Sequence, residues 1–224
     1  MKGKKTESSA VTPPQFGANQ DLLELQRLEL VSDADYGGFK LSGGALGSVR
    51  LKDTIVESAK FLQVSLNGSL FESCRLTDIR FEGCDFSNAD WTEGKFYRLE
   101  FVDCKLTGFK LIDTQLNNIF FGRCVGKLLQ LCGSTFKKVL FHECNFVGVD
   151  LSDCNFEEVV FSKCDLSEAK FYNAKIAGTD FRTSQLSDVK AYAADLSGAI
   201  ITRQQAFDLA PQLAALLGMQ VKEE

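Results

Sequence analysis

Cysteine and histidine are the residues of this chain whose types could support redox, nucleophilic or metal chemistry. The 224 residues include eight cysteines and one histidine. Five cysteines recur at intervals of twenty residues: Cys84, Cys104, Cys124, Cys144 and Cys164. Aligned thiols could bind a soft metal ion or oxidise to disulfides. The element that carries the thiols decides between these outcomes and a purely structural role.

That element follows from a strict five-residue repeat. Every fifth residue from Tyr36 to Ile201 occupies what we call a central position, and these 34 residues are large and apolar except Gly126 and Ala191. Neither a helix nor a strand keeps this period. Two residues before the central positions runs a column of mostly small residues, which holds seven of the eight cysteines. One large and one small inward residue per unit predict four-sided coils of twenty residues, stacked ~4.8 Å apart.

The units Cys84–Asn88 (CDFSN) and Ala194–Gly198 (ADLSG) carry a family resemblance. They resemble the pentapeptide-repeat family, whose consensus is A-(D/N)-(L/F)-x-x, over about three quarters of the chain. The resemblance implies an all-β fold, a right-handed quadrilateral β-helix solenoid of about eight coils with a short C-terminal helical cap. We expect the β-helix over residues 36–201, without an insertion. The family is not generally enzymatic.

Stacked coils place the thiols in the core. Residues twenty apart should lie above one another, so a ladder of seven phenylalanines forms beside the cysteine ladder: Phe61, Phe81, Phe101, Phe121, Phe141, Phe161 and Phe181. Free cysteine packs as a small hydrophobe. A spacing of ~4.8 Å also exceeds the Cβ separation of a relaxed disulfide, about 3.8 Å. We therefore expect reduced thiols, no metal and no cofactor, with Cys132 as the one accessible thiol.

We expect no catalytic residues. His142 follows a central position and should point outward, without a second histidine or a reactive cysteine beside it. Glycines two residues after central positions are explained by turns that favour positive φ. Gly126 should leave a local void in its ladder unless Leu129 fills it.

A stacked rod needs caps at both ends. Residues 1–20 are expected to form a flexible tail, and residues 21–35 a cap in which Leu22, Leu23, Leu25, Leu28 and Leu30 cover the first coil. Over residues 202–224, a capping box of Thr202 and Gln205 begins a helical cap. We expect two short helices, or one broken at Pro211, ending at Gly218. Candidate contacts for this cap, or for an end-to-end homodimer, are Phe207, Leu209, Leu213, Leu216 and Leu217.

The net charge of −5 argues against a general nucleic-acid binder. No apolar stretch reaches the ~20 residues that a transmembrane helix needs. The N-terminal residues lack the apolar segment of a secretory signal. We therefore expect a cytoplasmic protein with neither a membrane nor a nucleic acid as its direct partner. Monomer and end-to-end homodimer remain open alternatives.

Two binding functions are considered for the rod. The first rests on the outward column immediately before the phenylalanine ladder, which consists of Lys60, Arg80, Glu100, Phe120, Leu140, Val160 and Asp180. Its apolar part, Phe120, Leu140 and Val160 beside Val102 and His142, predicts a protein-interaction stripe, so that the rod serves as a scaffold for an unknown protein partner. The alternative reading is that these residues only support strand pairing. The family resemblance adds a second function, a DNA-mimicking modulator of DNA gyrase or topoisomerase IV that protects against their poisons, as in bacterial quinolone- and albicidin-resistance proteins. A polyanion mimic should have a continuous acidic side, and no side of this rod has one.

Overall fold

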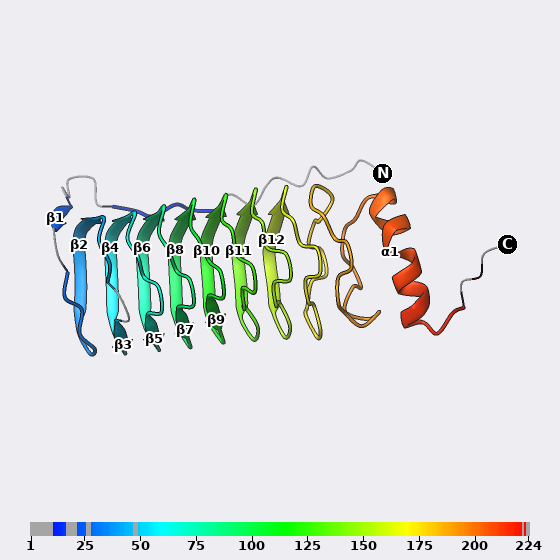
Figure 1. The fold of residues 1–224 in the computed structure, drawn as a ribbon, viewed down its shortest axis with the longest axis horizontal. Coiled ribbons are helices and arrows are strands. Elements are labelled where there is room, and N and C mark those ends of the chain that lie inside the picture. The colour runs from blue at the N-terminus through cyan, green and yellow to red at the C-terminus, as the bar shows by residue number, and fades with distance from the viewer. Residues whose placement is uncertain (1–10, 17–21, 26–27, 47–48, 221, 223–224) are drawn as a thin grey trace.

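The computed structural model describes residues 11–16, 22–25, 28–46, 49–220 and 222. It forms a rod of stacked coils with one helix at its C-terminal end (Figure 1). The strands are β1 (Leu23–Leu25), β2 (Asp35–Ser42), β3 (Arg50–Lys52), β4 (Ile55–Leu62), β5 (Leu70–Glu72), β6 (Arg75–Glu82), β7 (Asp90–Thr92), β8 (Lys95–Val102), β9 (Lys110–Ile112), β10 (Gln115–Gly122), β11 (Thr135–His142) and β12 (Asn155–Ser162). The helix is α1 (Arg203–Leu216).

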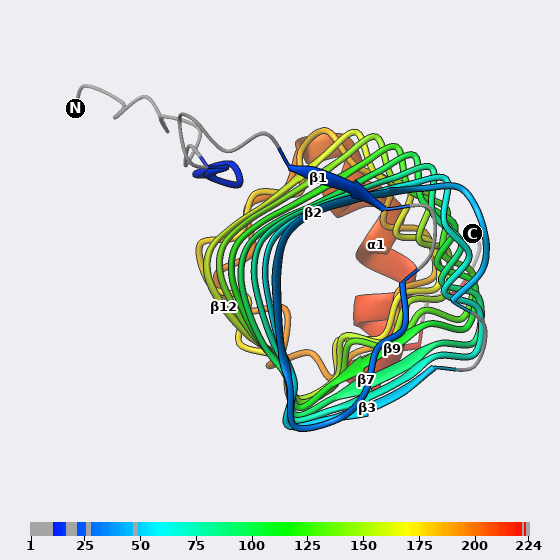
Figure 2. The ribbon, with the colours of Figure 1, turned by 90° about the vertical axis from the view of Figure 1, so that its left-hand side faces the viewer.

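The strands pair in parallel at a register of twenty residues. An eight-stranded sheet has the order β1-β2-β4-β6-β8-β10-β11-β12, and a four-stranded sheet has the order β3-β5-β7-β9. Phe121, for example, lies between Phe101 and Phe141. Single bridges continue the stacking beyond β12, as far as Ile200. Viewed along the rod, the coils superpose around a filled centre (Figure 2). The predicted right-handed, four-sided β-helix is confirmed.

The corners of the coils depend on positive φ angles. Twenty-two non-glycine residues among those described have φ between 49° and 60°, and all but Asp33 stand two residues after a central position. This conformation costs a non-glycine residue about 1–2 kcal/mol. Hydrogen bonds to the next coil hold the corners in place, as from Arg123 N to the His142 carbonyl at 2.9 Å. The stacking therefore outweighs a cost that recurs along the whole rod.

Aromatic rings fill one side of the interior. Successive rings of the phenylalanine ladder from Phe61 to Phe181 lie 4.6–5.3 Å apart between centroids, with interplanar angles of 6–21°. Each ring therefore contacts the rings of the coils before and after it. Offset stacked pairs of this kind contribute about 0.5–1.5 kcal/mol beyond the area they bury.

Gly126 leaves no void at its central position. A Cβ atom there would lie 3.2–3.3 Å from carbon atoms of Phe146, Leu106 and Leu129. Leu129 is buried and occupies the space that a large central residue would have filled. The compensation expected from Leu129 is therefore present.

The N-terminal cap adds one short strand to the large sheet. β1 pairs with β2, so that Leu25 lies opposite Leu41. Leu25, Leu28 and Leu30 pack against the core as expected. Leu23, at the start of β1 opposite Phe39, does not and is 66% exposed. Its expected role as a cap residue is therefore wrong.

The C-terminal cap is one helix, not two. α1 begins with the predicted capping box, in which Thr202 and Gln205 bond to each other's backbone N–H groups. It runs through Pro211 without a break, which corrects the expected interruption. Proline removes only one helical hydrogen bond, to the carbonyl of Phe207, and Phe207 is exposed on the outer side of the helix. Gly218, at φ 74°, follows the last turn as predicted.

α1 donates side-chain hydrogen bonds to backbone carbonyls of the last coil. Gln205 Nε2 donates to the carbonyls of Phe181 and Ser184, at 2.8 and 2.7 Å. Gln212 donates in the same way to the carbonyl of Val189. Leu209 is buried against the end of the core, and Leu213 packs beside it. The helix therefore closes both the apolar cross-section and the hydrogen-bonding edge of the rod.

Residues 11–16 are held against the rod. They run along its outer surface (Figure 1), where Thr12 N donates to Asn118 Oδ1 at 3.0 Å and Gln15 N to Asp78 Oδ1 at 2.7 Å. The prediction of a flexible tail is therefore wrong for this segment, because side-chain acceptors on the β-helix satisfy its backbone. Residues 1–10 and 17–20 of the expected tail lie outside the described residues.

Candidate interaction surfaces

The cysteines are structural residues of the core. All eight are free, seven are buried, and only Cys132 is partly exposed, as the repeat predicted. Ladder thiols donate to backbone carbonyls of the preceding coil, as from Cys124 Sγ to Phe101 O at 3.4 Å. Burial raises the pKa of Cys154 to about 12 and also raises the pKa of Cys132. Protonated, buried thiols are poor nucleophiles and poor metal ligands.

His142 lies among polar side chains. Its Nδ1 lies 3.3 Å from Ser162 Oγ, and its Nε2 lies 3.4 Å from a carboxylate oxygen of Glu143. Glu143 is in turn paired with Lys163 at 3.0 Å. No group of three or more potential metal-ligating side chains occurs among the described residues.

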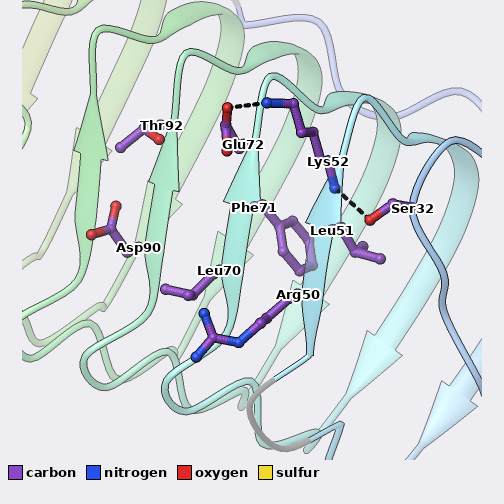
Figure 3. Close-up of a pocket in the computed structure, with 9 residues that line it drawn as sticks. All are labelled: Ser32, Arg50, Leu51, Lys52, Leu70, Phe71, Glu72, Asp90 and Thr92. Carbon is purple, nitrogen blue, oxygen red and sulfur yellow. Dashed lines mark hydrogen bonds and ion pairs between the residues drawn. The ribbon is translucent and has the colours of Figure 1, made fainter.

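A shallow depression on the outside of the four-stranded sheet is lined by charged and polar side chains (Figure 3). Three of its four charged side chains are paired, since Lys52 Nζ lies 2.6 Å from Glu72 and Lys110 pairs with Asp90 at 3.0 Å. The backbone N–H of Lys52 donates to Ser32 Oγ at 3.0 Å. These groups hold the edge of the sheet together and do not converge on a common point.

The apolar stripe, Phe120, Leu140 and Val160, is contiguous. The three residues are direct neighbours on β10, β11 and β12, and each is partly exposed. The ring of Phe120 lies over Gly122, where a Cβ atom would come within 2.6 Å of it. Phe120 therefore lies along the sheet and presents one face of its ring to solvent.

The two residues expected beside the stripe behave differently. Val102 is 5% exposed, so its inclusion in an exposed stripe was wrong. In the neighbouring coil, the residue at the matching position is Gly122, and the Phe120 ring occupies the space above that glycine. His142 is partly exposed at the edge of the stripe, as expected.

The other half of the outward column is polar. Arg80 bonds to Glu100 at 2.7 Å and to Glu82 at 2.9 Å. Lys60 lies over the ring of Phe16, 4.4 Å from its centroid. Segment 11–16 and this half of the column line a shallow groove of about 600 Å³. Among the described residues, the column thus changes between Glu100 and Phe120, from charged side chains next to segment 11–16 to apolar, partly exposed ones.

Sequence reasoning missed one exposed apolar pair. Leu128 is 71% exposed and Val125 is 48% exposed, both in the coil that contains Gly126. Leu128 also has a positive φ of 57°, which a large apolar residue rarely adopts. Its neighbours twenty residues away are Gly108 and Gly148, so it stands alone at its corner. A leucine in a position otherwise filled by polar residues and glycine was the available signal.

The five candidate contacts on the C-terminal segment fall into two groups. Leu209 and Leu213 face the rod and pack against its core as part of the cap. Phe207 is 66% exposed on the side of α1 opposite Leu209. Leu216 and Leu217 are exposed at the C-terminal end of the helix. Only Phe207, Leu216 and Leu217 are free to contact another molecule.

Charge on the rod is organised in pairs across coils. Nine ion pairs among the described residues join side chains exactly one coil, or twenty residues, apart. Arg123 and Asp103 at 2.7 Å are one example, and Lys137 and Glu157 at 2.6 Å another. Each acidic group in these pairs is neutralised by a base stacked on it.

Family models match most of this repeat. A model described as a pentapeptide repeat region matches residues 74–143 and 134–207, and one described as pentapeptide repeats (8 copies) matches residues 50–88. The matched residues amount to more than half of the chain. The chain belongs to the pentapeptide-repeat family. Among curated proteins, none matches the sequence significantly.

Solved pentapeptide-repeat structures resemble the chain at low identity. HetL from the cyanobacterium Nostoc sp. strain PCC 7120, involved in heterocyst differentiation regulation, is 17% identical; the match covers 75% of this chain and 85% of HetL, with a TM-score of 0.42. Full-length QnrB1, a plasmid-mediated fluoroquinolone resistance protein, is 18% identical, with 84% of this chain and 100% of QnrB1 covered and a TM-score of 0.34. The family assignment rests on the sequence match. Within the described residues, no helix of this pentapeptide-repeat protein has the length and hydrophobicity needed to span a bilayer.

Proposed function

We propose that this pentapeptide-repeat protein is a non-enzymatic, rigid scaffold that binds a protein partner through the apolar stripe. The observation that carries the proposal is the partly exposed run of Phe120, Leu140 and Val160 across three adjacent strands of the large sheet. Contiguous apolar surface of this kind marks interaction sites in soluble proteins. Among the described residues of the outward column, the charged half is paired or contacts segment 11–16, whereas the stripe is partly exposed. The cysteines of the chain are all free and seven are buried, which supports a reducing, cytoplasmic setting.

A capture experiment tests the stripe. The tagged full chain is incubated with native lysate, and captured proteins are identified by mass spectrometry. The double variant Phe120→Ser and Leu140→Ser should lose the specific partner, because both substitutions remove apolar contact area from the centre of the stripe. The matched control is Val125→Ser with Leu128→Ser, which removes a similar exposed apolar pair from another part of the rod. Loss of the partner in the control alone, or retention in both variants, would reject the stripe.

Modulation of DNA gyrase or topoisomerase IV is the second candidate. The rod shape supports it, but the ion pairs across coils work against a polyanion mimic, since they neutralise the acidic columns. A gyrase supercoiling assay, with and without a quinolone, tests it directly. Unchanged supercoiling and unchanged quinolone inhibition at micromolar protein would reject this function and leave the stripe proposal intact.

We also propose that the exposed C-terminal residues support an end-to-end homodimer. Phe207, Leu216 and Leu217 lie at the capped end of the rod with more than a third of each residue exposed. Sedimentation velocity over a range of concentrations distinguishes the dimer from the monomer. A dimer that dissociates on Phe207→Ser and Leu217→Ser substitution is the expected result, and a monomer at all concentrations would reject it.

A further inference from the structure

Segment 11–16 occupies a particular line on the rod. Thr12 lies at the coil of Asn118, Gln15 at the coil of Asp78, and Phe16 at Lys60 in the adjacent coil. It therefore crosses several strands of the large sheet and runs toward the N-terminal end of the rod (Figure 1). Asp78 and Asn118 are each only 7% exposed, whereas Glu158, at the same corner two coils beyond Asn118, is exposed.

The corner beneath this segment carries alternating acceptors and cations. We call Asp78, Arg98 and Asn118 the corner column; all three have positive φ angles and occupy successive coils. Arg98 donates twice to the Asp78 carboxylate, at 2.5 Å each, and its guanidinium stacks on Tyr97. The amide of Asn118 donates to Asn117 at 2.7 Å. These bonds hold the side chains of Asp78 and Asn118 while Oδ1 of each accepts from the segment.

The spacing of the two acceptors matches an extended chain. Asp78 and Asn118 are two coils apart, which corresponds to ~9.6 Å at the usual strand spacing. Three residues of a polyproline-II helix rise ~9.3 Å, and its period of three residues points the N–H groups of residues i and i+3 to the same side. Thr12 and Gln15 are three residues apart, and both of their N–H groups are bonded to the column.

The two prolines between these donors complete the match. Pro13 and Pro14 have no N–H group, so the stretch from Thr12 to Gln15 contains no backbone donor other than the two that are used. Proline also restricts itself and the preceding residue to extended conformations, which lowers the entropy lost on binding. Phe16 adds a cation–π contact with Lys60.

We propose that the corner column is a binding track for polyproline-II peptides, occupied here by the chain's own residues 11–16. The partner that fits it supplies two adjacent prolines with an N–H donor on each side and an aromatic residue after the second donor. The chain's own segment competes with that partner from within the same molecule. This site lies outside the apolar stripe, and its test is independent of the capture experiment.

The test uses the full chain and a labelled peptide. A full-length variant with Pro13→Gly and Pro14→Gly loses the preformed conformation of its own segment, which weakens its hold on the track. The probe is a fluorescein-labelled peptide with the sequence of residues 9–18, followed by fluorescence anisotropy. The variant should bind the probe about tenfold more tightly than the wild type, because the wild-type track is occupied from within. A probe with glycines in place of both prolines should lose most of this affinity.

Matched substitutions at two corners locate the site. In the Pro13→Gly and Pro14→Gly background, Asn118→Ala should weaken probe binding about fivefold or more, and Asn118→Asp, which keeps the acceptor oxygen, should restore it. The control is Asn88→Ala, because Asn88 has nearly the same φ (54° against 57°) but lies at a different corner. Equal effects of Asn118→Ala and Asn88→Ala, or equal probe binding by wild type and the proline variant, would overturn the proposal. So would a wild-type dimer that the proline substitutions abolish, since that assigns the track to a second copy.

Discussion

Two adjacent columns of the same strands differ in almost every respect. The phenylalanine ladder repeats one residue in seven coils, and its neighbour, the outward column, changes from lysine to arginine, glutamate, phenylalanine, leucine, valine and aspartate. Both columns share the same backbone register. The inward side chains contact their own equivalents in the next coil, so one residue type satisfies every coil. The outward side chains also contact solvent or segment 11–16, so the stacking does not require one residue type at these positions.

The difference between the two columns separates the residues that determine folding from those that determine binding. Inward columns determine that the coils stack, and outward columns determine what the stack can bind. The following variants test this division on the two columns and then on the corners between sides.

Phe121→Ala should have the largest effect. It removes a buried ring that stacks at 4.8 Å on Phe101 and 5.0 Å on Phe141, so the free energy of unfolding should fall by about 3–5 kcal/mol. Phe120→Ala, one residue away on the outward column, should lower it by less than about 1 kcal/mol. Urea unfolding followed by circular dichroism measures both. Similar losses for the two variants would contradict the division.

Gly126→Leu should be destabilising although it restores the repeat. Phe146, Leu106 and Leu129 already fill the space, so the added side chain should overpack the core and cost about 1–3 kcal/mol. Combining it with Leu129→Ala should recover part of the loss, since that substitution vacates the compensating volume. A single variant as stable as the wild type in the same urea titration would show that the coil can expand.

Leu128→Gly should stabilise the chain. Leu128 has a φ of 57° and is 71% exposed, so glycine relieves backbone strain and removes little packing. After allowance for the greater freedom of glycine in the unfolded chain, the gain should be about 0.5–1 kcal/mol. Thermal unfolding measures it, with Leu70→Gly on β5 as a control that should lose stability. A loss at Leu128 as well would mean that this leucine contributes packing.

The smallest effect should come from the outward pair of Asp150 and Lys170, and it should appear as a change in how stability depends on acid pH. Burial alone would raise the pKa of Asp150, but hydrogen bonds from Ser152 and Lys170 outweigh it and hold the pKa below its ordinary value. Its stabilising contribution is therefore present above the unfolded-state pKa of about 3.9 and is lost as pH falls through the lower folded-state pKa. Asp150→Asn should reduce the loss of stability between pH 5 and pH 2 by about 0.5 kcal/mol in urea titrations. An identical loss in variant and wild type would exclude this contribution.

The five-residue repeat predicted the architecture because a four-sided coil is the backbone arrangement that fits its period. Five residues per side and twenty per coil assign each side chain inward or outward, which placed the phenylalanines and seven cysteines in the core and left Cys132 partly exposed. The same rule identified the apolar stripe. It failed at Val102, where the exposure of an outward position depends on how neighbouring side chains cover it. The same rule also missed the exposed Leu128, because the five-residue period assigns all corner residues to the same kind of position whatever their type.

Local sequence was sufficient wherever an interaction spans one coil or a few residues. The ladders, the positive-φ corners and the capping box of Thr202 and Gln205 are of this kind, since their partners lie at known distances along the chain. The course of residues 11–16 depends instead on contacts with Asn118 and Asp78, 106 and 63 residues away. No repeat relates those residues to the segment, and their acceptors become its partners only once the coils have stacked. The sequence by itself therefore predicts the rod, whereas the binding track along its corner forms only in the folded molecule.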